Sequence, residues 1–286
     1  MDVQRIQVVG VVGAGQMGSG IAQVIAQAGY SVVMQDVSET FLETGVRRIQ
    51  QSLERLQKKG KLNDEQVRQI QGRIRKTLDL VEMKDAEIVI EAATENLSTK
   101  DEIFRKLDAV APAETLLATN TSSISITRIA AVTRRPDKVI GMHFMNPVPV
   151  MELVEVIRGL ATSQETFQCV HALSKRIGKT PVEAQDFPGF IVNRILMPMI
   201  NEAAFALYEG VGRPEDIDTA MKLGTNQPMG PLALADLIGL DTCLSIMGVL
   251  HDGLGDSKYR PCPLLRKYVD AGYLGRKSGR GFYSYE

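Results

Sequence analysis

Short apolar runs rich in β-branched residues alternate with longer amphipathic stretches over the first half of the 286-residue chain. Apolar runs of this kind predict buried strands, and the stretches between them, with apolar residues three or four positions apart, predict helices. Strands that alternate with helices build βαβ units, in which the strands run parallel. The pattern therefore predicts an α/β domain with a mostly parallel sheet. The expected strands are 6–12, 31–35, 86–92, 115–119 and 138–143, and the expected helices are 17–28, 39–60 and 100–110.

One further expected strand, at residues 151–157, follows its predecessor too closely to be parallel to it. A turn that contains Pro147 and Pro149 separates it from the strand at 138–143. A link this short cannot make the crossover that parallel strands need. We therefore expect these two strands to form an antiparallel pair within the sheet.

The pattern changes after about residue 185, where the segment Asp-Phe-Pro-Gly at 186–189 interrupts the chain. Helical periodicity dominates from there on, and loops rich in glycine and proline separate the helices. The expected helices are 190–208, 214–223, 232–250 and 263–271. The sequence thus predicts an α/β domain at 1–184 and an all-helical C-terminal domain at 185–286, which agrees with the length of typical domains.

A glycine-rich turn joins the first expected strand to the first expected helix. Residues 13–18 match the pattern G-x-G-x-x-G, in which the first glycine permits a tight turn, the second lets a pyrophosphate approach, and the third packs the helix on the strand. The N–H groups at the start of the helix would bind the phosphates. This context predicts a Rossmann-type domain, and a glycine-rich turn without a ligand is the alternative. The expected cofactor contacts here are Gly13, Gly15, Gln16, Met17 and Gly18.

An acidic residue at the end of the second strand bears on the choice of dinucleotide. Asp36 lies 18 residues after Gly18, which is about where such domains carry a carboxylate. That carboxylate would accept hydrogen bonds from a ribose 2′-hydroxyl and would repel a 2′-phosphate. We therefore expect NAD rather than NADP as the cofactor.

The charges are balanced over the whole chain but not along it. With 33 Lys and Arg against 34 Asp and Glu, the formal net charge is −1, so no global field favours nucleic acid or an anionic membrane. Residues 47–76, however, carry ten Lys or Arg and three acidic residues, a local net charge of +7. This stretch is either a solvated helix surface or a site for a polyanionic substrate. In the second case Ser52 and Lys59, on one face of a helix, would hold a phosphate.

Of the three histidines, His143 has the position expected of a catalytic group. It ends a strand at the carboxyl edge of the sheet, where open α/β sheets bind their ligands. If the antiparallel pair turns symmetrically about Pro149, His143 lies opposite Glu155 on the same face. A carboxylate beside an imidazole fixes its tautomer and stabilises the imidazolium, as a general base for alcohol oxidation requires. An ordinary polar pair across two strands is the alternative.

Further polar residues occur where the pattern around them is apolar or where a strand ends. Asn193 lies in an otherwise apolar helix, so a buried amide there needs hydrogen-bond partners, which structure alone could supply. Asn120, Thr121 and Ser122 follow a strand directly, again at the carboxyl edge of the sheet. An ordinary turn would explain this second group equally well.

The three cysteines, Cys169, Cys243 and Cys262, are an odd number without metal-like spacing. We therefore expect neither a disulfide framework nor a metal site. A chain without disulfides is typical of a reducing compartment, which we expect for this protein. No apolar run approaches the roughly 18 residues that cross a membrane, and the first residues lack the features of a targeting leader. The expectation is a cytoplasmic protein that binds neither nucleic acid nor a membrane.

Seven segments spread over nearly the whole chain carry a resemblance to known proteins. They are VGAGQMGSGIAQ at 12–23, ATENLSTK at 93–100, NTSSISIT at 120–127, HFMNPVPVMELVEV at 143–156, DFPGFIVNRILMPMINEA at 186–203, QPMGPLALADLIGLD at 227–241 and GRKSGRGFY at 275–283. Together they resemble the L-3-hydroxyacyl-CoA dehydrogenases, and most closely the short bacterial 3-hydroxybutyryl-CoA dehydrogenases.

The resemblance implies roles for the residues at matching positions. It implies that His143 is the catalytic base, that Glu155 orients it, and that Ser122 and Asn193 contact the reacting oxygen or the thioester region. The basic stretch at 47–76 would face the phosphates of CoA, which Ser52 and Lys59 would contact. The implied contacts to the nicotinamide end of NAD are Glu95, Lys100 and Asn146, and Asn120 and Ser122 are further expected contacts to the cofactor.

The implied reaction is the reversible oxidation of an (S)-3-hydroxyacyl-CoA, in particular 3-hydroxybutyryl-CoA, to the 3-ketoacyl-CoA by NAD. An NAD-dependent dehydrogenase of a hydroxy acid without CoA, such as a sugar acid, is an alternative on the same fold. A structural or regulatory protein that only binds a dinucleotide is another. The apolar helices of a C-terminal domain of about 100 residues, together with the resemblance, imply a homodimer formed through that domain.

Overall fold

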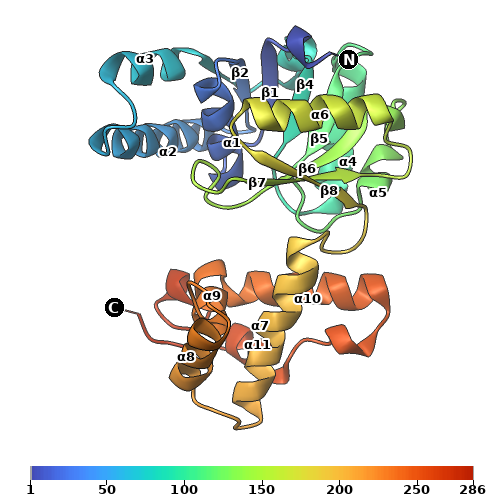
Figure 1. The fold of residues 1–286 in the computed structure, drawn as a ribbon. Helices are drawn as coiled ribbons and strands as arrows, with labels where there is room; N and C mark the ends of the chain where they lie inside the picture. The colour runs from blue at the N-terminus through green and yellow to red at the C-terminus, as the bar shows by residue number, and fades with distance from the viewer. Residues whose placement is uncertain (1, 286) are drawn as a thin grey trace. The chain divides into compact units, whose positions relative to one another are not determined.

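The computed structural model describes residues 2–285, which divide into one unit that ends at Asp186 and another that begins at Phe187. The first unit combines a sheet with helices, and the second is helical (Figure 1). Each has an apolar core of its own. The predicted fold class, a mostly parallel Rossmann-type sheet followed by a helical domain, is confirmed.

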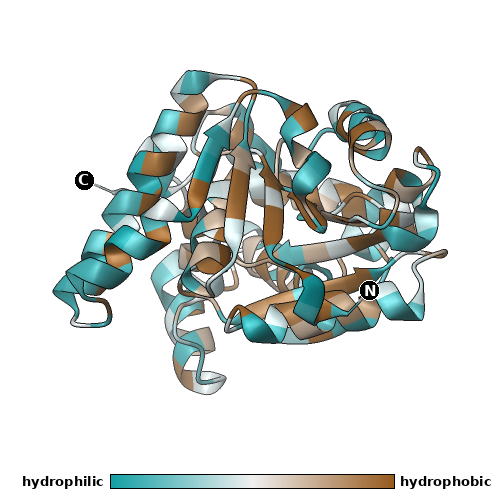
Figure 2. Ribbon diagram, turned by 90° about the horizontal axis from the view of Figure 1, so that it is seen from above, coloured by the Kyte–Doolittle hydropathy of each residue, from teal (hydrophilic) through white to brown (hydrophobic). Residues whose placement is uncertain are grey.

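The first unit is built on a sheet in which eight strands are found within residues 2–285, in the order β3-β2-β1-β4-β5-β6-β7-β8. All neighbouring strands are parallel except β6 and β7. The middle strands are mostly apolar, in keeping with the brown and white strands of Figure 2, and they are buried because helices pack against the sheet. Their bounds are β1 Val8–Val12, β2 Ser31–Gln35, β3 Ile74–Thr77, β4 Ile88–Glu91, β5 Leu116–Thr119, β6 Val139–Phe144, β7 Leu153–Arg158 and β8 Thr180–Gln185.

The two edge strands, β3 and β8, are not among the six strands that the sequence predicts. Most of their residues are at least partly exposed, and β8 contains Pro181. An edge strand pairs on one side only, so it needs no continuous apolar run and tolerates proline. For this reason neither segment carries the pattern of a buried strand.

Side chains cap the N-termini of four helices of the first unit, α3 to α6. Helix α4 begins three residues before the predicted start, because the side chain of Asn96 accepts a hydrogen bond from the backbone N–H of Thr99 (3.0 Å). The basic stretch extends over α2, α3 and the edge strand β3. Helices α2 and α3 lie side by side (Figure 1), and Gly60 with φ of 68° turns the chain between them. The bounds are α1 Gln16–Gln27, α2 Glu39–Lys58, α3 Asp64–Gly72, α4 Leu97–Val110, α5 Ile126–Ala130 and α6 Gln164–Arg176.

The carboxyl ends of the parallel strands meet at one edge of the sheet and place the motif residues there. The last residue of β1, Val12, lies beside the last residues of β2 and β4, Gln35 and Glu91. Glu91 in turn lies beside Thr119, the last residue of β5. The glycine turn, Asp36 and Asn120 follow these strand ends directly, so the topology alone gathers them at one edge.

Strands β6 and β7 form the antiparallel pair that the short link predicts. Their register places His143 opposite Glu155 and Phe144 opposite Val154. The symmetric turn about Pro149 is therefore confirmed. Since β6 runs parallel to β5, His143 also lies near the carboxyl edge of the sheet.

The second unit contains α7 Val192–Tyr208, α8 Pro214–Gly224, α9 Pro231–Ile238, α10 Leu240–Leu254 and α11 Pro263–Asp270. The single helix expected at 232–250 is wrong, because Gly239, with φ of 105°, breaks it into α9 and α10, which meet at 99°. Within the described part of the chain no single helix is long and apolar enough to span a membrane. The bent pair α9 and α10 meets that test of length and composition only when both helices are counted together.

A buried carboxylate explains the glycine-rich segment near the end of the chain. Asp236, in α9, accepts hydrogen bonds from the backbone N–H groups of Phe282 and Tyr283 and from the hydroxyl of Tyr285, all at 2.9 Å. A Cβ atom at Gly281 would lie 2.0 Å from the Asp236 carboxylate. The last residues of the described chain can therefore dock on α9 only if glycine occupies that position.

Candidate active site

The three glycines of the 13–18 turn differ in their structural roles. Gly13 has φ of 100°, and a Cβ atom at Gly18 would lie 1.8 Å from the backbone oxygen of Gly13. Both are thus required by the turn and by the packing of α1. A Cβ atom at Gly15, by contrast, would meet no protein atom within 4 Å, although Gly15 is the N-cap of α1. The open space before a helix N-terminus fits a phosphate that approaches the backbone.

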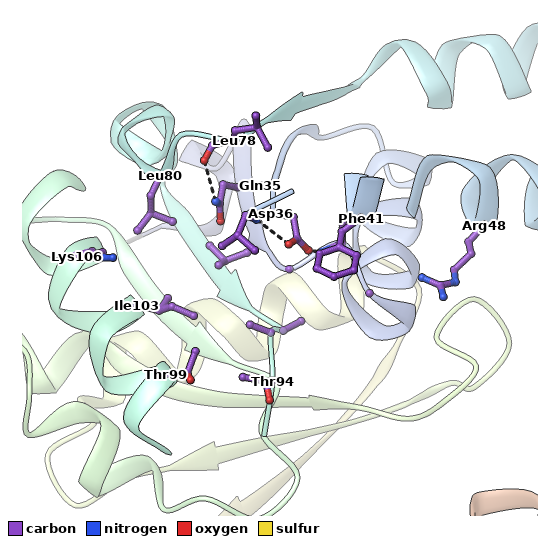
Figure 3. A pocket seen from close by; sticks show the side chains of 17 residues that line it. Gln35, Asp36, Phe41, Arg48, Leu78, Leu80, Thr94, Thr99, Ile103 and Lys106 are labelled. Atoms are coloured by element: carbon purple, nitrogen blue, oxygen red, sulfur yellow. Dashed lines mark hydrogen bonds between the residues drawn. The ribbon is translucent and has the colours of Figure 1, made fainter. Parts of the chain in front are cut away.

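A hollow of about 610 Å³ adjoins this turn at the carboxyl ends of the strands (Figure 3). On one side is Asp36, whose Oδ2 accepts a hydrogen bond from the N–H of Ala14 (2.6 Å) and whose Oδ1 accepts one from the N–H of Val37 (2.7 Å). An apolar hollow with a carboxylate at its edge suits a flat base attached to a ribose. The motifs do not indicate the rest of its lining, which includes Phe41, Leu78, Leu80, Ile103 and Lys106.

The pair His143 and Glu155 is buried and in contact. Nδ1 of His143 lies 2.7 Å from Oε2 of Glu155, and the two residues are 7% and 0% exposed. A carboxylate at this distance holds a proton on Nδ1, so Nε2 is the basic ring nitrogen. It also stabilises the imidazolium that forms when Nε2 takes up a proton. The geometry is that of a general base with its orienting partner.

A buried ion pair lies at the end of β4, next to the glycine turn. The ammonium of Lys100 is 2.7 Å from both carboxylate oxygens of Glu91, and the two residues are 1% and 0% exposed. The hydroxyl of Thr119 donates to the same carboxylate (2.7 Å), as does the backbone N–H of Ala93 (2.8 Å). Glu91 carries no motif signal, because an acidic residue at the end of an apolar strand reveals its partner only in the fold.

Lys100 also lies 3.8 Å from Glu95, which organises the loop that contains Ser122. Oε1 of Glu95 accepts hydrogen bonds from the hydroxyl of Thr121 (2.6 Å) and from the N–H groups of Ser122 (2.8 Å) and Ser123 (3.0 Å). Burial raises the pKa of Glu95, but the Lys100 charge and these hydrogen bonds lower it more, so the net pKa is below its ordinary value. The bonds to the charged carboxylate therefore stabilise the loop at neutral pH and are lost as the pH falls through that lowered pKa.

Hydrogen bonds also hold the loop at 145–152, which joins β6 to β7. Nε2 of Gln16, the first residue of α1, donates to Oδ1 of Asn146 (2.9 Å). The ammonium of Lys179 donates to two backbone oxygens of the same loop, those of Val148 (2.6 Å) and Met151 (2.7 Å). Burial lowers the pKa of Lys179, and the carboxylate of Glu152 only partly offsets this effect. The sequence pattern does not indicate Lys179, since its partners are backbone atoms.

A second hollow, of about 580 Å³, lies between α1, α2 and the 145–152 loop. Ser52 and Lys59 both line it, and so does Asn146. Two further cations, Arg48 and Arg55, come from the same helix. Of the two interpretations of the basic stretch, the geometry favours a site for a polyanion, because four polar or cationic residues of α2 and its C-cap face one cavity.

Two further predicted residues, Asn120 and Asn193, lie in different units. Oδ1 of Asn120 accepts a hydrogen bond from the N–H of Phe144 (2.8 Å) and so joins the end of β5 to the end of β6 beside His143. Asn193 lies in the first turn of α7, in the second unit, and is 8% exposed. Its participation in the site stays a prediction.

Comparisons with known proteins agree with this geometry. The model of the 3-hydroxyacyl-CoA dehydrogenase NAD binding domain matches residues 8–187, and that of the 3-hydroxyacyl-CoA dehydrogenase C-terminal domain matches residues 189–285. The chain belongs to the 3-hydroxyacyl-CoA dehydrogenase family. It is thus an NAD-dependent oxidoreductase, and the resemblance of its sequence segments is confirmed.

Members of the family match this chain over its whole length. A probable 3-hydroxybutyryl-CoA dehydrogenase of Bacillus subtilis is 63% identical over 286 residues, which cover 100% of this chain and 99% of that protein. The mitochondrial hydroxyacyl-coenzyme A dehydrogenase of Homo sapiens is 44% identical, and the aligned region covers 96% of this chain and 90% of that protein. The crystal structure of (S)-3-hydroxybutyryl-CoA dehydrogenase from Ralstonia eutropha has a TM-score of 0.96 at 54% identity and covers 98% of this chain and 99% of its own.

The ion pair at the end of β4 can be tested through stability. We expect Lys100→Met to lower the free energy of unfolding by about 3–5 kcal/mol, because it leaves the Glu91 carboxylate buried without its counter-charge. Urea denaturation followed by circular dichroism measures this. The double variant Glu91→Leu/Lys100→Met removes both charges and should be more stable than Lys100→Met alone. If the double variant is the less stable of the two, an uncompensated charge is not the cause.

Proposed function

We propose that this dehydrogenase interconverts (S)-3-hydroxybutyryl-CoA and acetoacetyl-CoA, with His143 as the general base. The observation that carries the proposal is the buried contact of 2.7 Å between His143 and Glu155 at the carboxyl edge of the sheet. The names of the similar enzymes from Bacillus subtilis and Ralstonia eutropha support the four-carbon substrate. The hollow that Ser52 and Lys59 line supports a CoA thioester over a free acid.

Two features of the chain fit the cofactor of the family. The space before Gly15 at the N-terminus of α1 fits the pyrophosphate, and Asp36 beside the 610 Å³ hollow fits a ribose with a free 2′-hydroxyl. NAD, when bound, accepts the hydride from C3 of the substrate. We propose cofactor contacts at Gly13, Gly15, Gln16, Met17 and Gly18 in the glycine turn and at Asn120 and Ser122. The proposed contacts at the nicotinamide end are Glu95, Lys100 and Asn146.

Residues of the chain transfer the proton of the reaction and stabilise the charge that the transfer creates. In the oxidation, Nε2 of His143 takes the proton of the substrate hydroxyl while Glu155 stabilises the imidazolium. In the reduction, the same imidazolium returns the proton to the alkoxide. We propose that Ser122, on the loop that Glu95 orders, and Asn193 contact the reacting oxygen or the thioester region. Their contribution is to position the substrate for proton transfer.

We further propose that two chains associate through the helical second unit. Several apolar side chains there are largely exposed, among them Ile195 (68%) and Leu223 (80%), and a unit of about 100 residues buries a modest share of its surface alone.

We also propose the cytoplasm as the compartment. All three cysteines are free, and free thiols persist where the surroundings are reducing.

The substrate can be tested with purified protein and NADH. We expect oxidation of NADH with acetoacetyl-CoA and at least about a hundredfold lower kcat/KM with free acetoacetate, because the free acid lacks all contacts in the second hollow. The change in absorbance of NADH measures both rates. Equal kcat/KM values would contradict the proposal and favour a hydroxy-acid dehydrogenase without CoA.

His143→Asn tests the base. We expect kcat to fall by at least about a hundredfold, since a general base contributes roughly 10²–10⁴-fold, while the affinity for NADH, measured by fluorescence, stays near that of the wild type. His171→Asn is the matched control, because His171 lies in α6 and packs against the ring of Phe167. The assignment of His143 is wrong if His143→Asn keeps most of the wild-type rate.

Asp36→Ala tests the choice of cofactor. We expect KM for NADH to rise by about ten- to a hundredfold, the equivalent of losing a charge-assisted hydrogen bond of about 1.5–3 kcal/mol. Discrimination against NADPH should weaken at the same time, because the variant no longer repels the 2′-phosphate. The exposed carboxylate of Glu43, on α2, provides the control Glu43→Ala. An unchanged ratio of kcat/KM for NADH and NADPH in Asp36→Ala would contradict this role.

A further inference from the structure

One face of α2 runs along both hollows of the first unit. Phe41, near the start of the helix, lines the hollow beside Asp36, whereas Ser52, Arg55 and the C-cap Lys59 line the second hollow. Successive positions in this set are eleven, three and four residues apart, so they share one side of a helix. Helix α2 therefore belongs to the cofactor hollow at one end and to the substrate hollow at the other.

Arg48 lies at the point where the two hollows adjoin. Among residues 2–285 it alone lines both of them. Figure 3 shows its side chain leaving the same helix as Phe41. One turn before it, Gly45 packs against the glycine turn, since a Cβ atom there would lie 2.7 Å from the backbone oxygen of Ala14. This close packing fixes the position of Arg48 relative to the phosphate-binding end of α1.

The two hollows take ligands of the same charge. NAD carries a pyrophosphate, and coenzyme A carries a pyrophosphate and a further phosphate, so the two ligands repel each other when both are bound. A guanidinium between them attracts both, and it cannot lose its charge at any physiological pH. A fixed charge would raise each affinity separately and leave the coupling unchanged. Arg48 is exposed, however, and its long side chain has many rotamers, so the first ligand to bind orders the guanidinium and the second ligand binds without that entropic cost.

We propose that Arg48 couples the binding of NAD to that of the CoA thioester. The ligand that binds first orders the guanidinium between the two hollows, so the second ligand binds more tightly than it would if Arg48 were absent, in opposition to the repulsion between the phosphates. Arg48 thus sets an equilibrium between sites and takes no part in the transfer of hydride or proton. The inference rests on the proposed function, because it requires CoA in the second hollow.

A thermodynamic cycle tests the coupling. Titration calorimetry gives the Kd of coenzyme A for the enzyme alone and for the enzyme saturated with NADH, and the ratio of the two values is the coupling factor. We expect Arg48→Gln to lower this factor at least about fivefold, with the larger effect at low salt, since exposed charges are screened. Arg48→Lys keeps the charge and should retain most of the coupling. The same factor should result when NADH is titrated with and without coenzyme A, because coupling is reciprocal.

Arg47→Gln is the matched control, since it changes the net charge equally one position away. Arg47 lines neither hollow, and its guanidinium donates to the hydroxyl of Thr44 (2.8 Å). We expect it to leave the coupling factor at the wild-type value. Lys59→Glu should weaken coenzyme A binding alone and in the NADH complex to a similar extent, so loss of affinity and loss of coupling can be told apart.

Several outcomes would overturn the proposal. A wild-type coupling factor in Arg48→Gln contradicts it directly. An equal loss in Arg47→Gln and Arg48→Gln shows a general effect of net charge and contradicts the specific position. If the wild-type enzyme binds NADH but not coenzyme A, the proposed function itself fails, and the coupling fails with it.

Discussion

The ion pair between Glu91 and Lys100 joins the parts of the first unit that the site requires. Glu91 ends β4 in the middle of the sheet, and Lys100 lies in the first turn of α4, so their contact fixes the helix to the strand end. Through Lys100 the pair also holds Glu95 beside the loop of Ser122. Burial of two charges costs several kcal/mol in desolvation, so the pair is a costly way to stabilise a fold. What it provides in return is a fixed geometry of this loop.

The features that depend on local spacing could be predicted from the sequence. The glycine turn needs only its own residues and the strand and helix on either side, and the register of β6 and β7 follows from a short link and the two-residue period of strands. For the same reason His143 and Glu155 could be paired by their positions in the chain. Ser52 and Lys59 could be assigned to one helix face from their interval alone.

The residues that act through contacts between distant segments could not be predicted. Leu78 and Leu80 reach the cofactor hollow only because β3 joins the sheet beside β2, and β3 has no apolar pattern. Lys179 bonds backbone oxygens of a loop about 30 positions earlier in the chain, and backbone acceptors leave no trace in the sequence. The break at Gly239 could not be predicted either, since a single glycine in an apolar run is compatible with a continuous helix.

Helix α2 fixes the distance between groups that line the two hollows of the first unit. Phe41 and Lys59 are 18 positions apart, which at 1.5 Å per residue is about 27 Å along the axis. An insertion of one residue between them would rotate one half of the helix by about 100° against the other, so that the two halves could no longer face their hollows at the same time. Substitutions within the second half leave that phase unchanged. The lining of the second hollow can therefore change through point substitutions near Lys59 while the hollow beside Asp36 stays intact, but not through a change in the length of this helix.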